Sequence, residues 1–352
     1  MARKSTAEIT EEEGPSLHPK FAEHLVAHAA QEKQLLAMSN GGKLPHAILF
    51  TGPRGIGKAT LAWRLARFLL TPQDAGASLF GDALPPESLH VSPTHPVFRR
   101  IVSGAHPDFL SLEADDIKVE EARSVAAFLS LTPAEGERRV VIIDSADAMN
   151  RNAANALLKT LEEPPLRTAM LLVSHNPGAL LPTIRSRCRT LRVPPLTPVE
   201  FAKVMATIAP ELDAQQTLVF AELSGGSPGV ALRLAAARAD TMYQELAERI
   251  ASPATLKTHS FAERFNRKEN KDAFAVLMRL LPWLLTRIAS GKECAVEIFP
   301  GERETLARLR DIRPLDAWLD LYERANKLLA DTDHLHLDKK QAIITLLRAA
   351  GE

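Results

Sequence analysis

Cysteine is nearly missing from this 352-residue chain, which contains only Cys188 and Cys294. A structural zinc site of the four-thiolate kind is therefore excluded. The histidines His90, His95 and His106 remain, but without thiolates their spacing fits no common structural zinc site. We expect two reduced thiols, as in a cytosolic protein, and no bound metal.

The chain also has no formal net charge and few aromatic residues. Lysine plus arginine and aspartate plus glutamate each number 43, so the formal charge is zero, and aromatic residues make up 5% of the chain. A protein that binds DNA on its own usually offers a basic field or a row of stacking aromatics. Any DNA contact of this chain is therefore expected to be local and shared with partner proteins.

Long apolar runs are missing as well. None approaches the ~20 residues that a membrane span needs, and residues 1–6 lack the apolar core of a signal peptide. These absences predict a soluble, cytoplasmic protein without membrane partners. The length predicts two or three domains, and a hydrophobic content of 45% is ample for their cores.

A phosphate loop is the first motif that is present. The apolar run 44–51 predicts a buried strand, the pattern GxxxxGK follows it, and a helical pattern occupies 61–68. Glycines in this context let backbone N–H groups converge on phosphate oxygens at a helix N-terminus, and the lysine reaches the β and γ oxygens. The candidate nucleotide-binding residues of the loop are Gly52, Gly55, Gly57 and Lys58.

The loop lacks the hydroxyl that would complete it. The last position of GxxxxGK[ST] is Ala59, and the hydroxyl normally found there ligates Mg²⁺. Thr60 comes one residue late, which on a helix turns its side chain about 100° away. Two interpretations stay open: a loop kept for its fold alone, and a loop that retains residual ATP or ADP binding.

A second ATPase element follows at 138–144, a β-branched apolar run that predicts a central parallel strand. Asp144 at its carboxyl end is in the position of a second Mg²⁺ partner and joins the candidate nucleotide site. ATPases of this kind next have a glutamate that polarises the attacking water, but this chain has Ser145, and its next acid is Asp147. Because a serine hydroxyl is a poor general base at neutral pH, we expect hydrolysis to be doubly disabled.

Three long blocks, 155–165, 171–177 and 181–188, resemble in order the bacterial clamp-loader branch of the AAA+ ATPases, and 106–109 and 117–120 fit the same branch. Within it the chain is most similar to the delta-prime subunits of DNA polymerase III, whose ATP site is typically degenerate. The gamma and tau subunits would keep the threonine and the glutamate. The resemblance implies an α/β P-loop domain with a parallel sheet, a small helical lid and an all-α collar.

The resemblance also assigns a role to the stretch Ser186-Arg187-Cys188. The family's arginine finger stabilises charge on the γ-phosphoryl group bound by a neighbouring subunit, an effect worth ~10³–10⁵ in rate in related chemistry. An arginine in a loop would, taken alone, be expected to pair with a surface carboxylate. The residues 183–188 match the family's finger motif one by one, so Arg187 is the catalytic candidate, acting in trans.

Two further positions depart from the motor subunits by the same resemblance. Gly229 stands where the second sensor motif has an arginine that reads a phosphate. Ser174 or His175 stands near the first sensor position, which orients the lytic water, and we expect His175 to pack or hydrogen bond rather than to catalyse.

The expected organisation is a disordered tail over 1–19, the AAA+ domain over 20–193, the lid over 194–238 and the collar over 239–352. Thr197 and Pro198 mark the start of the lid as an N-cap and a first helical residue. The stretch 71–105, where clamp-loader subunits often carry a zinc module, has no cysteine and is expected to be a surface loop.

The sequence thus predicts a non-hydrolysing subunit of the DNA polymerase III clamp loader, which needs no cofactor of its own. It would sit beside gamma/tau and delta and reach the sliding clamp and primed DNA through the complex. The alternative is an ATP-hydrolysing motor subunit of the gamma/tau type, in which Thr60 and Asp147 take the metal and base roles. A stand-alone DNA-binding module is a weaker alternative, disfavoured by neutral charge and few aromatics.

Overall fold

The computed structural model describes residues 18–72, 86–114, 116–251, 255–266, 271–291, 295–335 and 337–351. The chain divides into two compact units, Met1–Ile208 and Ala209–Glu352. Most of the expected tail, residues 1–17, lies outside the described residues, as does Cys294. The expected domain borders at 193/194 and 238/239 stay predictions.

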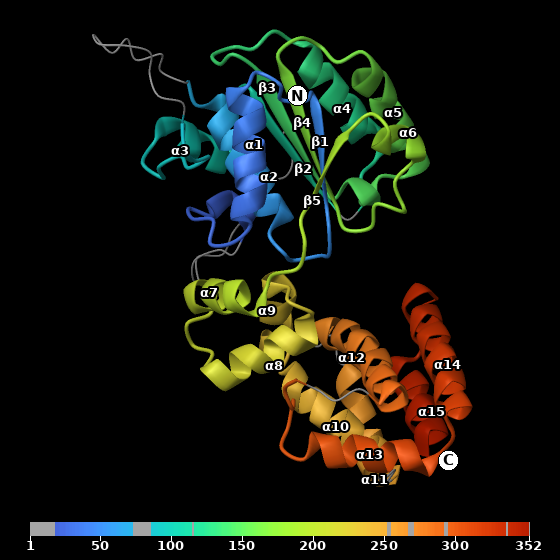
Figure 1. Ribbon diagram of the computed structural model, residues 1–352. Helices are drawn as coiled ribbons and strands as arrows, with labels where there is room; N and C mark the ends of the chain where they lie inside the picture. The colour runs from blue at the N-terminus through green and yellow to red at the C-terminus, as the bar shows by residue number, and fades with distance from the viewer. Residues whose placement is uncertain are drawn as a thin grey trace. The chain divides into compact units, whose positions relative to one another are not determined.

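A five-stranded parallel sheet forms the centre of the first unit, with strand order β2-β3-β4-β1-β5 (Figure 1). Its strands are β1 (Ala47–Thr51), β2 (Phe109–Glu113), β3 (Arg139–Asp144), β4 (Thr168–Ser174) and β5 (Arg189–Arg192). Strands β1 and β3 lie within the apolar runs that predicted them, and the predicted parallel sheet is confirmed.

Helices cover both faces of this sheet (Figure 1). Successive strand side chains point to opposite faces, so Ile48 and Phe50 pack on one side and Ala47 and Leu49 on the other. The first side holds α1 (Ala29–Asn40), α2 (Lys58–Leu70) and α3 (Pro96–Val102). The second side holds α4 (Val119–Ser130), α5 (Arg151–Glu162) and α6 (Pro182–Arg185). Two 3-10 turns, η1 (Pro19–Phe21) and η2 (Ala146–Ala148), complete the sheet unit together with α7 (Pro198–Ile208).

The expectation of a surface loop over 71–105 is wrong for its last part, since 96–102 form helix α3. The His95 ring accepts a hydrogen bond from the Val97 N–H at 3.2 Å, and Pro96 occupies the first turn. Three apolar side chains of α3 are buried in the core beside α2: Val97, Phe98 and Ile101. The end of this stretch is therefore part of the domain core. Residues 73–85 lie outside the described residues.

The start of α7 has the predicted cap. Thr197 Oγ1 accepts a hydrogen bond from the Glu200 N–H at 3.3 Å, and the Glu200 carboxylate accepts one from the Thr197 N–H at 3.0 Å. This reciprocal capping box satisfies two backbone donors that the helix itself cannot pair. Pro198 is the first helical residue, as predicted.

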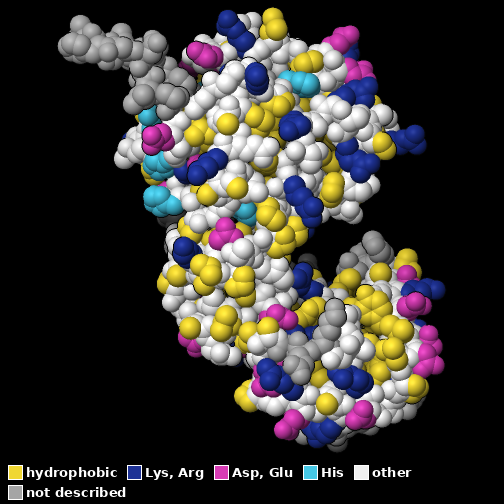
Figure 2. Space-filling view, viewed as in Figure 1, with side chains coloured by type: hydrophobic (Ala, Val, Ile, Leu, Met, Phe, Trp, Pro, Cys, Tyr) yellow, Lys and Arg dark blue, Asp and Glu magenta, His cyan; other side chains and the backbone are white. Residues whose placement is uncertain are grey.

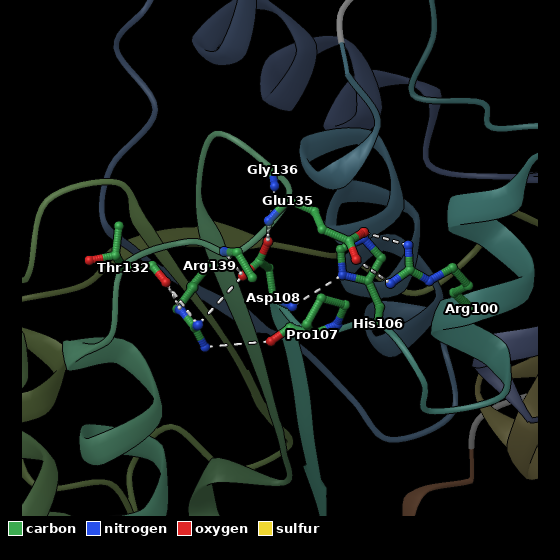
Figure 3. A network of polar contacts seen from close by, with 9 residues as sticks. Arg100, His106, Pro107, Asp108, Thr132, Glu135, Gly136 and Arg139 are labelled. Carbon is green, nitrogen blue, oxygen red and sulfur yellow. Dashed lines mark hydrogen bonds and ion pairs between the residues drawn. The ribbon is translucent and has the colours of Figure 1, made fainter.

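Asp108, in the block 106–109 that fits the resemblance, has a structural role (Figure 3). Asp108 is fully buried, and its carboxylate accepts hydrogen bonds of 2.7, 2.9 and 3.0 Å from the backbone N–H groups of Ala134, Glu135 and Gly136. Arg139 Nη2 lies 3.6 Å from Asp108 Oδ1. Burial alone would raise the pKa of Asp108, but the three N–H donors and Arg139 outweigh it and hold that pKa below its ordinary value. This carboxylate fixes the loop that precedes β3.

The second unit is helical among its described residues. Its helices are α8 (Ala214–Ser224), α9 (Pro228–Ala236), α10 (Ala239–Ala251), α11 (Thr255–Glu263), α12 (Lys271–Ser290), α13 (Glu302–Ile312), α14 (Leu315–His334) and α15 (Lys339–Gly351), with the turn η3 (Arg264–Asn266). The all-α character predicted for this half of the chain is confirmed.

A buried ion pair ties four of these helices together. Glu302 is fully buried and accepts hydrogen bonds from the Tyr243 hydroxyl and the Ile298 N–H, both at 2.7 Å. Arg287 places Nη2 3.0 Å from Glu302 and Nη1 3.1 Å from Glu222. Because each charge is paired and hydrogen bonded, the cost of removing it from water is offset. The pair joins α8, α10, α12 and α13.

One described helix is apolar enough by length and composition to cross a membrane, which corrects the expectation that no run approaches this length. An 18-residue window, Ala273–Ser290 in α12, has a mean hydropathy of 1.4. Arg279 and Arg287 interrupt the apolar residues of this window. Half of the window is buried inside the unit, as in the core helix of a soluble protein. Such a helix is weak evidence for a membrane span.

Charged side chains are scattered over the face in view in Figure 2. On the sheet unit lysine and arginine side chains are spread over this face and acidic ones lie mainly at its rim, whereas the helical unit shows both kinds.

Candidate functional site

The parallel sheet gathers the predicted site residues at one edge. Strand register pairs Thr51 with Ser174 and Asp144 with Val173. Since the carboxyl ends of parallel strands share an edge, the phosphate loop after β1 lies beside the residues that follow β3 and β4. The structure thus brings together the loop, Asp144 and His175.

The glycines of the loop have structural reasons of their own. A Cβ on Gly52 would lie 2.1 Å from the Val193 carbonyl oxygen, so no other residue fits beside the end of β5. Gly55 and Gly57 have φ of 78° and 100°, in the region that favours glycine. Gly57 is the residue immediately before α2. The interpretation of a loop kept for its fold therefore gains a physical basis.

The Lys58 side chain folds back onto its own loop. Its Nζ donates to the carbonyl oxygens of Gly52 at 2.7 Å and Pro53 at 2.5 Å, and the side chain is buried. Burial lowers the pKa of Lys58 to about 8, while the charges of Asp144 and Asp147 act in the opposite direction. The ammonium that would bind phosphate oxygens is thus engaged with peptide oxygens.

The position that would hold the metal-binding hydroxyl borders the core. Ala59 packs its methyl group against the apolar cluster around α2. Thr60 follows it in the first turn of the same helix and is half-buried. The hydroxyl is therefore replaced by an apolar contact.

His28 is a loop neighbour that sequence reasoning missed. It precedes α1, its ring is buried, and its Nε2 lies 2.6 Å from the Ile56 carbonyl oxygen inside the phosphate loop. Burial lowers the pKa of His28, against the opposing effects of this hydrogen bond and of Glu200. A single histidine before a helix carries no pattern that announces such a contact, because Ile56 is 28 residues away.

Asp144 lies half-buried at the end of β3. Burial, aided by the charge of Glu113, raises the pKa of Asp144 to about 6, although Lys58 and Arg54 oppose this. The Nε2 of His175 lies 3.9 Å from Asp144 Oδ1. His175 therefore faces the carboxylate that was expected to hold a metal.

Asp147 is committed to a structural role. Its two carboxylate oxygens accept hydrogen bonds from the backbone N–H groups of His175 at 3.0 Å and Asn176 at 3.1 Å. A carboxylate that braces the end of β4 in this way is a poor substitute for a catalytic base. This contact disfavours the alternative in which Asp147 rescues hydrolysis.

The residues present do not fit a nucleotide with its Mg²⁺. Lys58 is bound to loop carbonyls, Ala59 packs against the core, and the His28 ring lies against the loop. Among the described residues no group of three or more histidine, cysteine, aspartate or glutamate side chains is placed to hold a metal ion. No chemical step at this loop follows from the geometry.

Arg187 lies between α6 and β5, with about a third of its side chain exposed. Its Nη1 donates to the Thr183 carbonyl oxygen at 2.9 Å and to Ser186 Oγ at 3.3 Å. Its Nη2 lies 2.8 Å from Glu162 Oε1 at the end of α5. The guanidinium is thus held on its own chain yet remains within reach of solvent.

Cys188 and the histidines that were considered for zinc make contacts that stabilise the fold. The Cys188 thiol packs against the core, and burial raises its pKa to about 11. The rings of His95 and His106 accept backbone hydrogen bonds, while His90 stacks on His24. Gly229 is the second residue of α9 in the helical unit.

Comparisons with known proteins support one family. Residues 27–197 match the family model described as DNA polymerase III, delta subunit. The chain is 38% identical over 208 residues to the DNA polymerase III subunit delta' of Pseudomonas aeruginosa, covering 57% of this chain and 60% of that protein. It is 32% identical over 206 residues to the delta' subunit of Escherichia coli, covering 57% and 58%.

A third relative is a tau subunit. The chain is 36% identical over 162 residues to the DNA polymerase III subunit tau of Escherichia coli, covering 45% of this chain and 23% of that protein. The matched segment spans about three fifths of the two delta' relatives. Over residues 27–197, the chain therefore belongs to the delta-prime family of clamp-loader AAA+ proteins.

Proposed function

We propose that this chain acts as the delta-prime subunit of a bacterial DNA polymerase III clamp loader. It would be a stationary component of the ring of subunits, helping to load the sliding clamp on primed DNA during replication. Its own partners would be the gamma/tau and delta subunits, and the clamp and DNA would be reached through the complex, in the cytoplasm.

One observation carries this proposal: an arginine is presented at the Ser186-Arg187-Cys188 stretch, while the chain's own phosphate loop lacks the groups for hydrolysis. Arg187 is anchored to Thr183 and Glu162 but stays partly exposed. A guanidinium so placed can exchange a carboxylate for the γ-phosphate of a nucleotide on a neighbouring subunit, because both are anions that accept from its planar fork.

The motor-type alternative is less well supported by the same site. It needs Thr60 and Asp147 to serve as metal ligand and base, yet both oxygens of Asp147 accept backbone hydrogen bonds. We therefore retain the non-hydrolysing subunit as the proposed function.

Assembly and ATPase measurements test the proposal together. The purified chain is mixed with delta and gamma/tau, the size of the product is measured by light scattering, and ATPase is followed with clamp and primed DNA. We expect a complex containing this chain, with full ATPase depending on Arg187. A chain that stays monomeric beside these partners, or that hydrolyses ATP alone in a Lys58-dependent manner, contradicts the proposal.

A further inference from the structure

His28 has a backbone conformation that histidine adopts infrequently. Its φ of 66° and ψ of 31° lie in the left-handed region, where the Cβ of an ordinary residue is crowded against the following carbonyl. Glycine is the usual residue in this conformation. A strained residue of this kind persists only when its surroundings fix it, so the contacts of its side chain identify what holds it there.

Those contacts lead into the phosphate loop. The Nε2 of His28 lies 2.6 Å from the Ile56 carbonyl oxygen, and because a carbonyl can only accept, Nε2 carries the proton. The ring lies 3.6 Å from the position that a Cβ would take on Gly57. Gly57 immediately precedes α2, so the ring lies beside the residues through which the loop enters this helix.

The same ring is almost entirely removed from solvent, with 5% of His28 exposed. It therefore fills space beside residues 56 and 57 instead of leaving that space open to a ligand. Lys58 acts on the same loop, since its Nζ is bound to the carbonyl oxygens of Gly52 and Pro53. Two side chains of this protein thus satisfy three peptide oxygens of the loop.

We propose that the His28 side chain acts as a plug, which keeps the nucleoside part of a nucleotide out of the phosphate loop. Its imidazole would occupy the space beside Ile56 and Gly57 that the sugar and base need. The replacements at Ala59 and Ser145 concern the metal ion and the attacking water. They do not by themselves exclude the sugar and base of a nucleotide, whereas the His28 ring lies against the loop itself. The plug goes beyond the proposed function, because it concerns this chain's own loop and not Arg187.

The test uses the purified full-length chain and ADP without Mg²⁺, with affinity measured by calorimetry. Two variants, His28→Gly and His28→Asn, both tolerate the left-handed conformation but differ in side-chain size. We expect ADP affinity to rise about tenfold or more in His28→Gly, with His28→Asn between it and the wild type. Adding Lys58→Ala to His28→Gly should remove the gain, which assigns the binding to this loop.

Inorganic tripolyphosphate separates a plug for nucleosides from a general closure of the loop. It has the phosphates but no sugar or base, so its affinity should be the same for the wild type and both His28 variants. His24→Gly is the matched control, since His24 is exposed and stacks on His90 away from the loop contacts; it should leave ADP affinity unchanged.

Two results would overturn the plug: a folded His28→Gly or His28→Asn chain whose ADP affinity equals that of the wild type, or an equal gain in affinity for tripolyphosphate. Circular dichroism and thermal melting establish folding of each variant. If His28→Gly fails to fold, His28→Asn decides the question alone. The measurement needs no partner subunit, so its failure leaves the proposed role of Arg187 to be judged separately.

Discussion

Arg187 and Glu162 form an ion pair within the chain, with 2.8 Å between Nη2 and Oε1. Both side chains are about a third to a half exposed, and ion pairs of this kind are worth about 0–1 kcal/mol. A neighbouring phosphate, which carries more charge, can therefore displace Glu162. The ion pair is compatible with an arginine finger that is not engaged with a neighbour's nucleotide, and equally with an ordinary surface contact. Mutations distinguish the two.

Arg187→Ala should leave the chain folded and assembling, because a partly exposed side chain contributes little to the core. It should slow the DNA- and clamp-stimulated ATPase of the complex, and only in part, since one adjoining motor is affected. Arg187→Lys should rescue poorly, because an ammonium lacks the planar fork. Glu162→Gln is the control and should keep most ATPase activity. Equal effects of Arg187→Ala and Glu162→Gln would identify a purely structural ion pair.

The chain's own site should stay inactive after partial repair. Ala59→Thr combined with Ser145→Glu restores the two residue types that hydrolysis lacks, yet we expect no meaningful ATP turnover. In the double variant Gly229 still occupies the position where the resemblance expects the sensor arginine, and His28 still lies against the loop. Phosphate release by the purified double variant measures this. Turnover that disappears when Lys58→Ala is added would show that the site had been misjudged.

Asp108 should be needed for the stability of the sheet unit. Asp108→Asn removes the charge that accepts three backbone hydrogen bonds, so we expect a loss of about 2–4 kcal/mol in urea unfolding near neutral pH. Hydrogen exchange should show lost protection at the amides of Ala134, Glu135 and Gly136, which donate to this carboxylate. Glu135→Gln, at the exposed pair with Arg100, should have little effect.

The same carboxylate predicts a direction with pH. The folded state holds the pKa of Asp108 below its ordinary value, so its contribution is complete above the unfolded pKa of about 4 and is lost as pH falls through the folded pKa. The gap in stability between wild type and Asp108→Asn should therefore shrink in acid. A gap that stays constant from pH 7 to pH 3 would contradict the assignment.

The helical unit should depend on Glu302. Glu302→Ala removes the buried partner of Arg287 and the acceptor of the Tyr243 hydroxyl, and we expect a loss of about 3–5 kcal/mol. Thermal melting with tryptophan fluorescence measures it, because Trp283 lies against Arg287 in this unit. Glu297→Ala, at a more exposed pair with Arg303, should cost much less. Equal losses of stability in the two variants would mean that the buried pair contributes no more than the exposed one.

Local sequence determined the elements that carry the site. A continuous apolar run and the glycine pattern predicted β1, the loop and α2 in their order, since strand, turn and helix preferences act over a few residues. The replacement of the metal and base residues by Ala59 and Ser145 is visible from the motif spacing. The residues 183–188 likewise marked Arg187 without any coordinates, because a motif is a statement about neighbours in the chain.

Tertiary structure decided what those residues contact. Nothing near His28 in the sequence indicates that its ring reaches Ile56, that Asp147 braces the end of β4, or that Glu162 holds Arg187. Each of these contacts joins residues 25 or more positions apart. The contacts of His28 and Asp147 form at the edge where the parallel strands have their carboxyl ends. Glu162 and Arg187 instead precede β4 and β5, so they meet at the amino edge of the sheet. Helix α3 was missed for a related reason: its apolar side chains gain their stability from packing beside α2, which a stretch rich in proline and small residues does not reveal.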